Sequence, residues 1–471
     1  MNTEKPKSEK RASVDYVGKW QRINWTVIET KVNRLQSRIA KAAREGRFNL
    51  LKILQYLLTK SYYAKLLAVK KVISNKGSKT PGIDGDVWNN DVKRYKASPL
   101  RRTYIKKPNG KLRTLGIPTM HDRSMQALYA MALDPVAESI LSTRAFGFRK
   151  YRSCQDAQSY IHRCLCKKGS ADWILEGDVK GCFDNISHQW LLDNVPMNKR
   201  ILRQFLKAGF VYRKNLFPTE NGTPQGGIIS PILANLTLNG LAEMLEKKYS
   251  ISPTGNISRQ NNKHRIHTVV YADDFIITAN NEETLHQVKR DIEKFLLVRG
   301  LELSESKTLI TNIRDGFDFL GWNIRKYKTK LIITPSKKSV KRVCENIRET
   351  VRKDLMQKQE VLIKRLNAII RGWCNYHRSS CAKESFQTID MYVFRCLWHW
   401  VKRRHANKNN LWRKNRYFVR EGSRDWIFRT ESVKLLFASD TKIKRHQLIR
   451  FVANPYLREY DEYYSKRRVA C

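Results

Sequence analysis

The chain has 471 residues, of which 41% are hydrophobic, and its 91 Lys and Arg against 43 Asp and Glu give a formal net charge of +48. This length and apolar content fit several folded domains and exclude a disordered chain. So large a positive excess adds nothing to stability but attracts polyanions, which favours nucleic acid as the partner over a merely solvated basic surface.

Two further classes are excluded by the distribution of apolar residues and cysteines. No apolar run approaches the roughly 18 residues of a membrane-spanning helix, and the first twenty residues lack the apolar core of a secretion signal. The nine cysteines are odd in number and contain no C-x-x-C pair. We therefore expect no membrane partner, no structural zinc and reduced thiols in a cytosol-like compartment.

The N-terminal part of the chain is predicted to be helical and basic. Residues 1–20 are predicted to be a flexible lead. After them, four apolar residues recur at helical spacing with basic residues between them: Ile28, Val32, Leu35 and Ile39. A second, more apolar helix is expected over 50–58. The turn-forming and basic stretch 75–85 predicts a loop at the entry to a new domain.

Beyond this loop the pattern changes twice. From about 100 to 330, short strand-like runs alternate with helical ones, which indicates an α+β domain. From Ser339 onward the chain is predicted to be helical, with one apolar stripe: Val340, Val343, Ile347, Val351 and Leu355. Residues 401–471 hold 19 Lys and Arg against 7 Asp and Glu, with aromatic residues interleaved.

Three carboxylates indicate a metal site. Asp273 and Asp274 lie between two apolar strand-like runs, and Asp178 follows a third such run. Neighbouring carboxylates at a tight turn repel each other unless a cation lies between them. If the strands bring the three together, they can hold two Mg²⁺ ions about 3.5–4 Å apart, one activating a primer 3′-hydroxyl and the other orienting a nucleoside triphosphate. An Asp-Asp pair alone is more often a solvated turn, so the combination carries the prediction.

The order of the motifs resembles that of the reverse transcriptases encoded by group II introns. The palm motifs are Asp178 with Phe183, the segments 222–235 and 316–322, and Tyr-Ala-Asp-Asp at 271–274. The fingers motifs are 104–119 and 145–149. The resemblance implies an α+β right-hand polymerase with fingers and an antiparallel palm sheet, followed by an α-helical thumb or X domain and a basic C-terminal DNA-binding region.

The resemblance also implies a division of the chain. It predicts a flexible basic lead (1–20), a helical, RNA-binding N-terminal extension with the start of the fingers (21–85), the fingers and palm (86–328), the thumb or maturase X domain (329–405), and a basic DNA-binding region without an endonuclease (406–471). Residues 453–461 resemble the segment that leads into an endonuclease in longer relatives. No Cys-Cys/His-His endonuclease pattern follows this segment in the sequence, so we expect no cleavage of the second DNA strand.

Carried over by position, the metal ligands are Asp178, Asp273 and Asp274, together with the backbone carbonyl of Val179. They would hold two Mg²⁺ ions, and deoxynucleoside triphosphates would be the substrates. The primer grip would be formed by Phe319, Leu320 and Gly321.

Four further residues are expected at the incoming nucleotide. Lys107 and Arg113 would bind its triphosphate, although a solvated hairpin tip would have the same composition. Phe183 would be the steric gate that excludes a 2′-hydroxyl, with an ordinary core aromatic as the alternative. Gln225 would lie near the nucleotide, between small residues that permit close backbone approach.

Residues 369–377 and 397–405 resemble the thumb of group II intron maturases, whose helices bind intron RNA. Six residues are implied as RNA contacts: Arg371, Tyr376, His377, Lys402, Arg403 and Arg404. Aromatic and Arg side chains can stack on unpaired bases and pair with phosphates. For the aromatic residues of these helices, packing in the core is the open alternative.

The implied function is that of an RNA-directed DNA polymerase and maturase. It would bind its group II intron RNA, assist splicing, and copy the RNA from a target DNA primer during retrohoming, in a bacterial cytoplasm or an organellar matrix. Two alternatives stay open. One is a splicing-only RNA-binding maturase with vestigial catalytic residues, and the other is an intron-independent relative in defence or repair.

Overall fold

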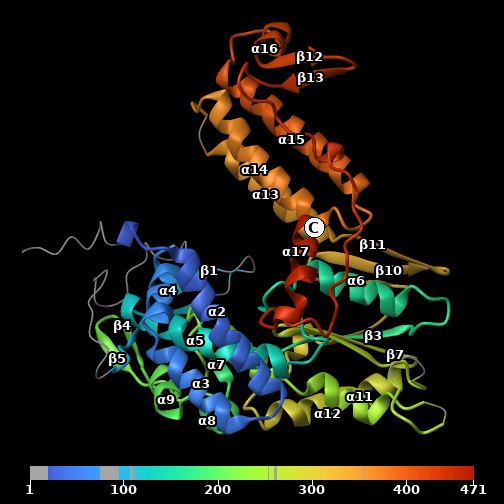
Figure 1. The fold of residues 1–471 in the computed structure, drawn as a ribbon. Coiled ribbons are helices and arrows are strands. Elements are labelled where there is room, and N and C mark those ends of the chain that lie inside the picture. Colours follow the sequence, from blue (N-terminus) through green and yellow to red (C-terminus); the bar gives the residue numbers. More distant parts are fainter. Residues whose placement is uncertain are drawn as a thin grey trace, which may run out of the picture. The chain divides into compact units, whose positions relative to one another are not determined.

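The computed structural model describes residues 20–74, 95–106, 110, 112–252, 254–258, 262–353 and 355–470 (Figure 1). The chain divides into two compact units. The first unit comprises Met1–Ser139, Pro196–Pro218 and Gly226–Ile229, and the second comprises Ile140–Val195, Thr219–Gln225 and Ser230–Cys471. No described helix is both long enough and apolar enough to cross a membrane.

The first unit packs a group of helices around one apolar core. These helices are α2 Trp25–Arg44, α3 Phe48–Lys60, α4 Tyr62–Ile73 and most of α5 Met120–Ile140. Helix α9 Lys199–Leu206 also belongs to this unit. Helix α2 begins where the Asn24 side chain accepts a hydrogen bond from the Val27 amide. It buries Ile28, Val32 and Ile39, which confirms the basic amphipathic helix predicted from their spacing.

A four-stranded sheet completes the first unit in the order β2-β1-β4-β5. Its strands are β1 Leu100–Lys106, β2 Leu112–Ile117, β4 Phe210–Tyr212 and β5 Asn215–Phe217. Strands β1 and β2 form an antiparallel hairpin, whereas β1 and β4 run parallel.

The second unit is built on a four-stranded antiparallel sheet in the order β6-β7-β3-β8. Its strands are β3 Trp173–Asp178, β6 His267–Tyr271, β7 Asp274–Ala279 and β8 Leu309–Asn312. Helix α6 Cys154–Leu165 covers one face, and α11 Leu241–Tyr249 and α12 Glu282–Leu297 cover the other (Figure 1). Because both faces are covered, the centres of β6 and β7 are buried without alternation.

Short elements connect this sheet to its surroundings. They are α7 Cys182–Asn185, α8 His188–Asn194, α10 Ser230–Leu238 and the 3₁₀ turn η2 Glu305–Lys307. A smaller antiparallel sheet in the order β11-β10-β9 follows, with β9 Phe317–Phe319, β10 Trp322–Tyr327 and β11 Lys330–Pro335. The antiparallel sheet and the helices after it confirm the predicted α+β fold class.

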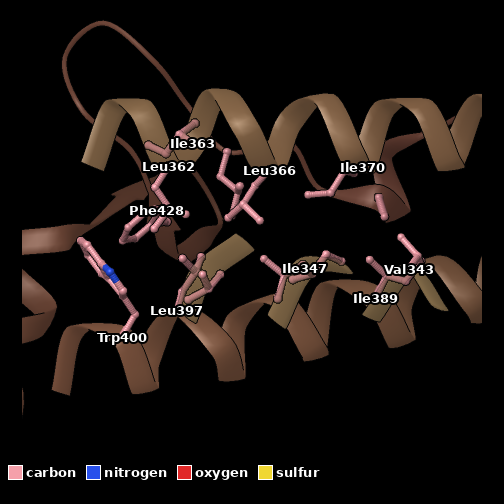
Figure 2. Packing of buried hydrophobic residues seen from close by; sticks show 14 of the residues in the cluster. Val343, Ile347, Leu362, Ile363, Leu366, Ile370, Ile389, Leu397, Trp400 and Phe428 are labelled. Atoms are coloured by element: carbon pink, nitrogen blue, oxygen red, sulfur yellow. The ribbon is translucent and has the colours of Figure 1, made fainter. Parts of the chain in front are cut away.

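Three long helices form the next layer: α13 Lys337–Arg352, α14 Gln359–His377 and α15 Lys383–Arg404. Their apolar faces meet in one core, which Figure 2 shows in close view. The predicted stripe is confirmed at Val343, Ile347 and Val351, which α13 buries. Leu355 lies outside this helix, because α13 ends at Arg352.

The C-terminal part is not wholly helical, contrary to the helical pattern predicted from Ser339 onward. It contains α16 Asn410–Tyr417, the hairpin β12 Phe418–Glu421 with β13 Arg424–Phe428, the 3₁₀ turns η3 Ala438–Asp440 and η4 Arg458–Tyr460, and α17 Asp461–Ala470. Tyr417, Phe418 and Phe428 are buried in the core of the three helices. These aromatic residues therefore extend the core instead of lying on a nucleic-acid surface.

Candidate active site

A tight hairpin turn places the two adjacent aspartates. Tyr271 pairs with Asp274 at the end of β6 and β7, so Ala272 and Asp273 are the two turn residues. Ala272 has a φ of +57°, the left-handed conformation that a two-residue hairpin requires. On the other side of β7, Asp274 pairs with Asp178 of β3. The sheet register thus brings together the three carboxylates that the sequence singled out.

The carboxylates interact with one another electrostatically. Burial, then the charges of Asp273 and Asp178 and a hydrogen bond to Asp178, raise the pKa of Asp274 to about 7. Such mutual repulsion is relieved by a cation. The carboxylate oxygens also suit Mg²⁺, which prefers hard ligands of this kind.

Lys307 is a site residue that the sequence analysis missed. Its Nζ lies 2.8 and 2.9 Å from the two carboxylate oxygens of Asp178. This hydrogen bond raises the pKa of the Lys307 ammonium. A signal was present in the topology, because Lys307 lies two residues before β8 begins at Leu309, and β8 pairs antiparallel with β3. The pairing of Glu176 with Leu309, continued by two residues, places Lys307 beside Asp178 at the end of β3.

The carboxylates are ligands of the right type for a divalent metal, but their side chains are not yet arranged around an ion. Within the described ranges, no group of three His, Cys, Asp or Glu side chains is already arranged to ligate an ion. Asp178 is held instead by Lys307. Val179 is buried, and its amide donates to the Asp273 carbonyl at 3.3 Å. The role of its own carbonyl as a ligand stays a prediction.

The loop that carries Gln225 is hydrogen-bonded to helix α7, which carries Phe183. Phe183, on α7, is 9% exposed, and its ring meets Phe148 edge-on at 6.2 Å between centroids. The Phe183 carbonyl accepts a hydrogen bond from the Thr223 amide at 2.6 Å. Gln225 Nε2 lies 3.4 Å from the Asp184 carboxylate. The loop that carries Gln225 is therefore attached to the helix that carries Phe183.

This attachment depends on Gly222. Its φ is +82°, and a Cβ added there would lie 2.5 Å from the Asp184 carbonyl oxygen and 2.6 Å from that of Phe183. We expect Gly222→Ala to destabilise the protein by about 2–5 kcal/mol, because the left-handed strain adds to the backbone clash. The measurement is the melting temperature by circular dichroism.

Gly255→Ala is the matched control for this substitution. Gly255 has a φ of +85°, but a Cβ there would meet nothing within 4 Å. The control shares the strain without the clash, so it should lower the melting temperature less. Equal losses in the two variants would contradict the close approach at Gly222.

The two residues predicted to bind the triphosphate are not placed at the site. Lys107 lies outside the described residues. Arg113 is exposed on β2, opposite Ile105 in the hairpin, and belongs to the first unit, whereas the carboxylates belong to the second. Contact of either residue with a nucleotide stays a prediction.

The predicted primer grip is the turn between β9 and β10. Phe319 is buried, and Leu320 and Gly321 have φ values of +49° and +82°, as in a two-residue hairpin turn. The Leu320 carbonyl accepts a hydrogen bond from the Tyr376 hydroxyl at 2.7 Å, and the Gly321 carbonyl accepts one from the Ser336 amide at 2.9 Å. Both turn carbonyls are therefore held from the side of the long helices.

The predicted RNA contacts at the end of α14 need correction. His377 is 1% exposed, accepts or donates a hydrogen bond with Ser339 at 3.0 Å, and has a pKa lowered to about 4 by burial. The prediction that His377 contacts RNA is wrong, since its side chain faces the interior. Tyr376 stacks on the fully buried Trp322, with centroids 4.7 Å apart, and uses its hydroxyl on Leu320. Its contacts are those of a packing residue.

The three adjacent basic residues at the end of α15 differ in their exposure and contacts. Lys402 and Arg403 are exposed, but Arg404 is half-buried and donates to the Gln357 carbonyl at 2.6 Å. Arg404 therefore anchors the chain after α13, and the prediction that it contacts RNA is not supported by its contacts. Arg371 is exposed on α14 and remains a candidate.

Three segments of the chain match models of known protein families. Residues 105–324 match the model of the reverse transcriptase (RNA-dependent DNA polymerase) family, and residues 20–99 match the model of the N-terminal domain of reverse transcriptase. Residues 340–418 match the group II intron, maturase-specific domain.

Individual relatives agree with these matches. The chain is 31% identical over 359 residues to the group II intron-encoded protein LtrA of Lactococcus lactis subsp. cremoris, covering 61% of this chain and 59% of that protein. It is 28% identical over 343 residues to the protein YkfC of Escherichia coli, covering 64% and 90%. It is 27% identical over 382 residues to a putative COX1/OXI3 intron 1 protein of Saccharomyces cerevisiae, covering 67% and 44%. The chain thus spans less than two thirds of the Lactococcus and yeast relatives.

Proposed function

We propose that the chain belongs to the reverse transcriptases that carry a group II intron maturase domain, and that it is an RNA-directed DNA polymerase that binds a group II intron RNA. In this proposal it assists splicing of that RNA and copies it from a target DNA primer, as in retrohoming. Its place of action would be a bacterial cytoplasm or an organellar matrix.

One observation carries the polymerase proposal: the register that sets Asp178 beside Asp274 at the turn of an antiparallel sheet, with the pKa of Asp274 raised. Asp178, Asp273, Asp274 and the Val179 carbonyl would hold two Mg²⁺ ions. Bound there, the ions would supply activation of the primer 3′-hydroxyl and stabilisation of the leaving pyrophosphate.

The chain's own residues would position the reactants. The turn Phe319-Leu320-Gly321 would hold the primer end, and its carbonyls are fixed by Tyr376 and Ser336. A rigid turn favours synthesis because misplacement of reacting groups by about 1 Å lowers rates strongly. Lys307 orients the Asp178 carboxylate.

The remaining nucleotide-site residues would select and hold the substrate. Lys107 and Arg113 would bind the triphosphate of a deoxynucleotide, with Gln225 beside it. Phe183 would exclude a 2′-hydroxyl from the site.

The exposed basic residues of the long helices would bind the intron RNA. Of the six residues that the resemblance implies as RNA contacts, Arg371, Lys402 and Arg403 are exposed and available for this. The basic helices of the N-terminal part would add contacts to the RNA, and the region 406–471 would contact target DNA. Each contact would add to affinity mainly through phosphate charge, so binding should weaken steeply with salt.

A double variant tests the RNA surface. Lys402→Gln with Arg403→Gln should weaken RNA binding and lower the magnitude of the slope of log affinity against log salt by about 1–2, because each lost phosphate contact removes about one released counterion. Fluorescence anisotropy with labelled intron RNA at several salt concentrations measures this slope.

The control removes the same charge elsewhere. Lys289 and Arg290, another Lys-Arg pair, lie on α12. This helix covers the face of the β6-β7-β3-β8 sheet that is opposite α6 (Figure 1). Lys289→Gln with Arg290→Gln should leave the slope close to that of the parent. Equal slopes in the two double variants would count against a specific RNA surface at the end of α15.

The polymerase proposal itself is tested by primer extension on an RNA template with deoxynucleotides and Mg²⁺. DNA synthesis by the parent protein is the expected result, and RNA binding without synthesis would favour the splicing-only alternative. Sequencing the RNA that co-purifies with the protein separates the remaining alternative. An intron RNA is expected, whereas its absence would favour a role in defence or repair.

A further inference from the structure

A basic groove lies between α13 and α15, two of the long helices that pack against each other. It has a volume of about 390 Å³, and Val351 and Trp400 of the helical core form part of its lining. Of the described residues that line it, none is Asp or Glu. We propose that this groove binds the phosphates of an RNA strand. Its basic lining consists of Arg348, Arg352, Arg395, His399 and Arg403.

The four arginines of the groove are not neutralised by the protein. All four are exposed, and none of their side chains forms an ion pair or a hydrogen bond with another residue of the described chain. Like charges that share one groove repel one another, so a bound anion lowers their energy. The planar guanidinium of arginine also matches phosphate oxygens, because it donates two parallel hydrogen bonds.

Charges from both helices act on the same part of the groove. Cys396 of α15 lines it beside Tyr392. Burial raises the pKa of the Cys396 thiol, and the charges of Arg348 and Arg352 on α13 oppose this rise. The charge of Arg348 likewise opposes the rise in pKa that burial causes at Tyr392. The arginines of α13 therefore lie close to the groove-lining residues of α15.

The spacing of the charges suits a strand more than a single phosphate. Arg348 and Arg352 are four residues apart on α13, and Arg395, His399 and Arg403 repeat this interval on α15. At 1.5 Å per residue the interval is about 6 Å, and the row on α15 is about 12 Å long. One phosphate cannot contact the whole row. A strand of a duplex carries a phosphate about every 3.4 Å along its axis, so it can.

Helix ends explain only two of the four arginines. Arg352 and Arg403 lie in the last turns of α13 and α15, where the helix dipole stabilises a cation. Arg348 and Arg395 lie before those turns, so this effect does not account for them. Substitution of Arg348 and Arg395 therefore tests the groove without disturbing the helix ends.

The choice of RNA as the strand rests on the proposed function, whereas the site for a polyanion does not. The residues that line the groove lie within 340–418, the segment that matches the group II intron, maturase-specific domain. The exposed Lys402 directly precedes Arg403, so the positive surface continues beyond the groove. We therefore expect the strand to be part of the intron RNA.

The test uses the full-length protein with Arg348→Gln and Arg395→Gln, and a labelled single-stranded RNA oligonucleotide. Loss of phosphate contacts should lower the magnitude of the salt slope by about 1–2 and weaken binding several-fold at moderate salt. Lys289→Gln with Arg290→Gln is the matched control, and melting temperatures verify that each variant folds. Equal changes of slope in the two double variants would overturn the proposal.

A charge-conserving variant separates electrostatics from packing. Arg348→Lys with Arg395→Lys keeps both positive charges but loses the guanidinium fork, so it should retain most of the parent slope. A slope reduced as much as in the glutamine variant would overturn the proposal, because the loss would then not follow the charge.

Cys396 provides a second readout, since its thiol lines the groove. Saturating RNA oligonucleotide should slow its alkylation by iodoacetamide several-fold, as measured by mass spectrometry. Cys381 is exposed and does not line the groove, so its alkylation should change less. A Cys396 rate that RNA leaves unchanged would overturn the proposal.

Primer extension by the parent, run in parallel, separates this result from the proposed function. A parent that synthesises DNA, with neither the change of slope nor the protection of Cys396, refutes the groove alone. A parent that shows both effects without synthesis refutes the polymerase alone.

Discussion

Asp274→Asn is expected to abolish DNA synthesis on a primed RNA template, lowering the rate by at least about a thousandfold. Asn has nearly the shape of Asp but lacks the charge that a divalent ion requires. The side chain lies opposite Asp178 in the register of β7 and β3, so the substitution removes one of the carboxylates that face each other. Single-turnover primer extension at saturating Mg²⁺ measures the loss.

The same variant should be more stable than the parent in the absence of metal. Burial and the neighbouring carboxylates raise the pKa of Asp274 from its ordinary 3.8 to about 7. Between these values the folded protein binds a proton that the unfolded chain has released, so the parent loses stability as pH rises from about 4 to about 7. Asn does not titrate, so the variant should lose less stability than the parent over this pH range. Melting temperatures in EDTA across this range measure the difference.

Asp315→Asn is the control for both measurements, since Asp315 is exposed in the turn before β9. It should synthesise DNA at the parent rate and keep the parent's dependence of melting temperature on pH. Added Mg²⁺ should raise the melting temperature of the parent and the control more than that of Asp274→Asn, since only the first two keep the full set of carboxylates. Synthesis by Asp274→Asn at the parent rate would refute the assignment of the site.

The hairpin that carries Asp273 and Asp274 was predictable because its signal is local. Two apolar runs flank Asp273 and Asp274 in the sequence, and the structure makes them adjacent strands. The partnership with Asp178 depends on pairing over a long sequence separation, so the residues alone gave it only as a condition, and the resemblance then implied it. Lys307 was missed for a related reason. Its position follows from the pairing of β8 with β3, and nothing in its local sequence marks it.

In the long helices, the spacing of apolar residues predicts the buried face but not the role of polar and aromatic residues. The spacing of apolar residues predicted the buried face of α13. Spacing does not distinguish a polar or aromatic residue that binds RNA from one that packs against another part of the protein. His377 and Tyr376 are turned inward because the end of α14 lies against Trp322 and the β9–β10 turn. That contact joins segments more than fifty residues apart, so no local pattern reveals it.

Phe183→Ala is expected to raise the use of ribonucleotides relative to deoxynucleotides by about a hundredfold, as the ratio of their kcat/KM values. Phe183 lies five residues after Asp178, and its ring and its backbone each have a neighbour. Phe148 meets it edge-on, and Thr223 holds its backbone carbonyl. In the proposed nucleotide site, this ring would leave no space for a 2′-hydroxyl. Alanine would open that space, and steady-state incorporation of single nucleotides measures the ratio.

Two further variants separate selection from packing. Phe183→Ala also removes a buried ring, which costs about 3–5 kcal/mol at core positions, so a loss of activity alone would be ambiguous. Phe183→Leu keeps most of the bulk and should retain most of the discrimination. Phe148→Ala removes the supporting ring, which is exposed, and should change the ratio less than Phe183→Ala does. A ratio unchanged in Phe183→Ala, with deoxynucleotide incorporation retained, would make Phe183 an ordinary core aromatic, because the space it vacates would then lie away from the sugar.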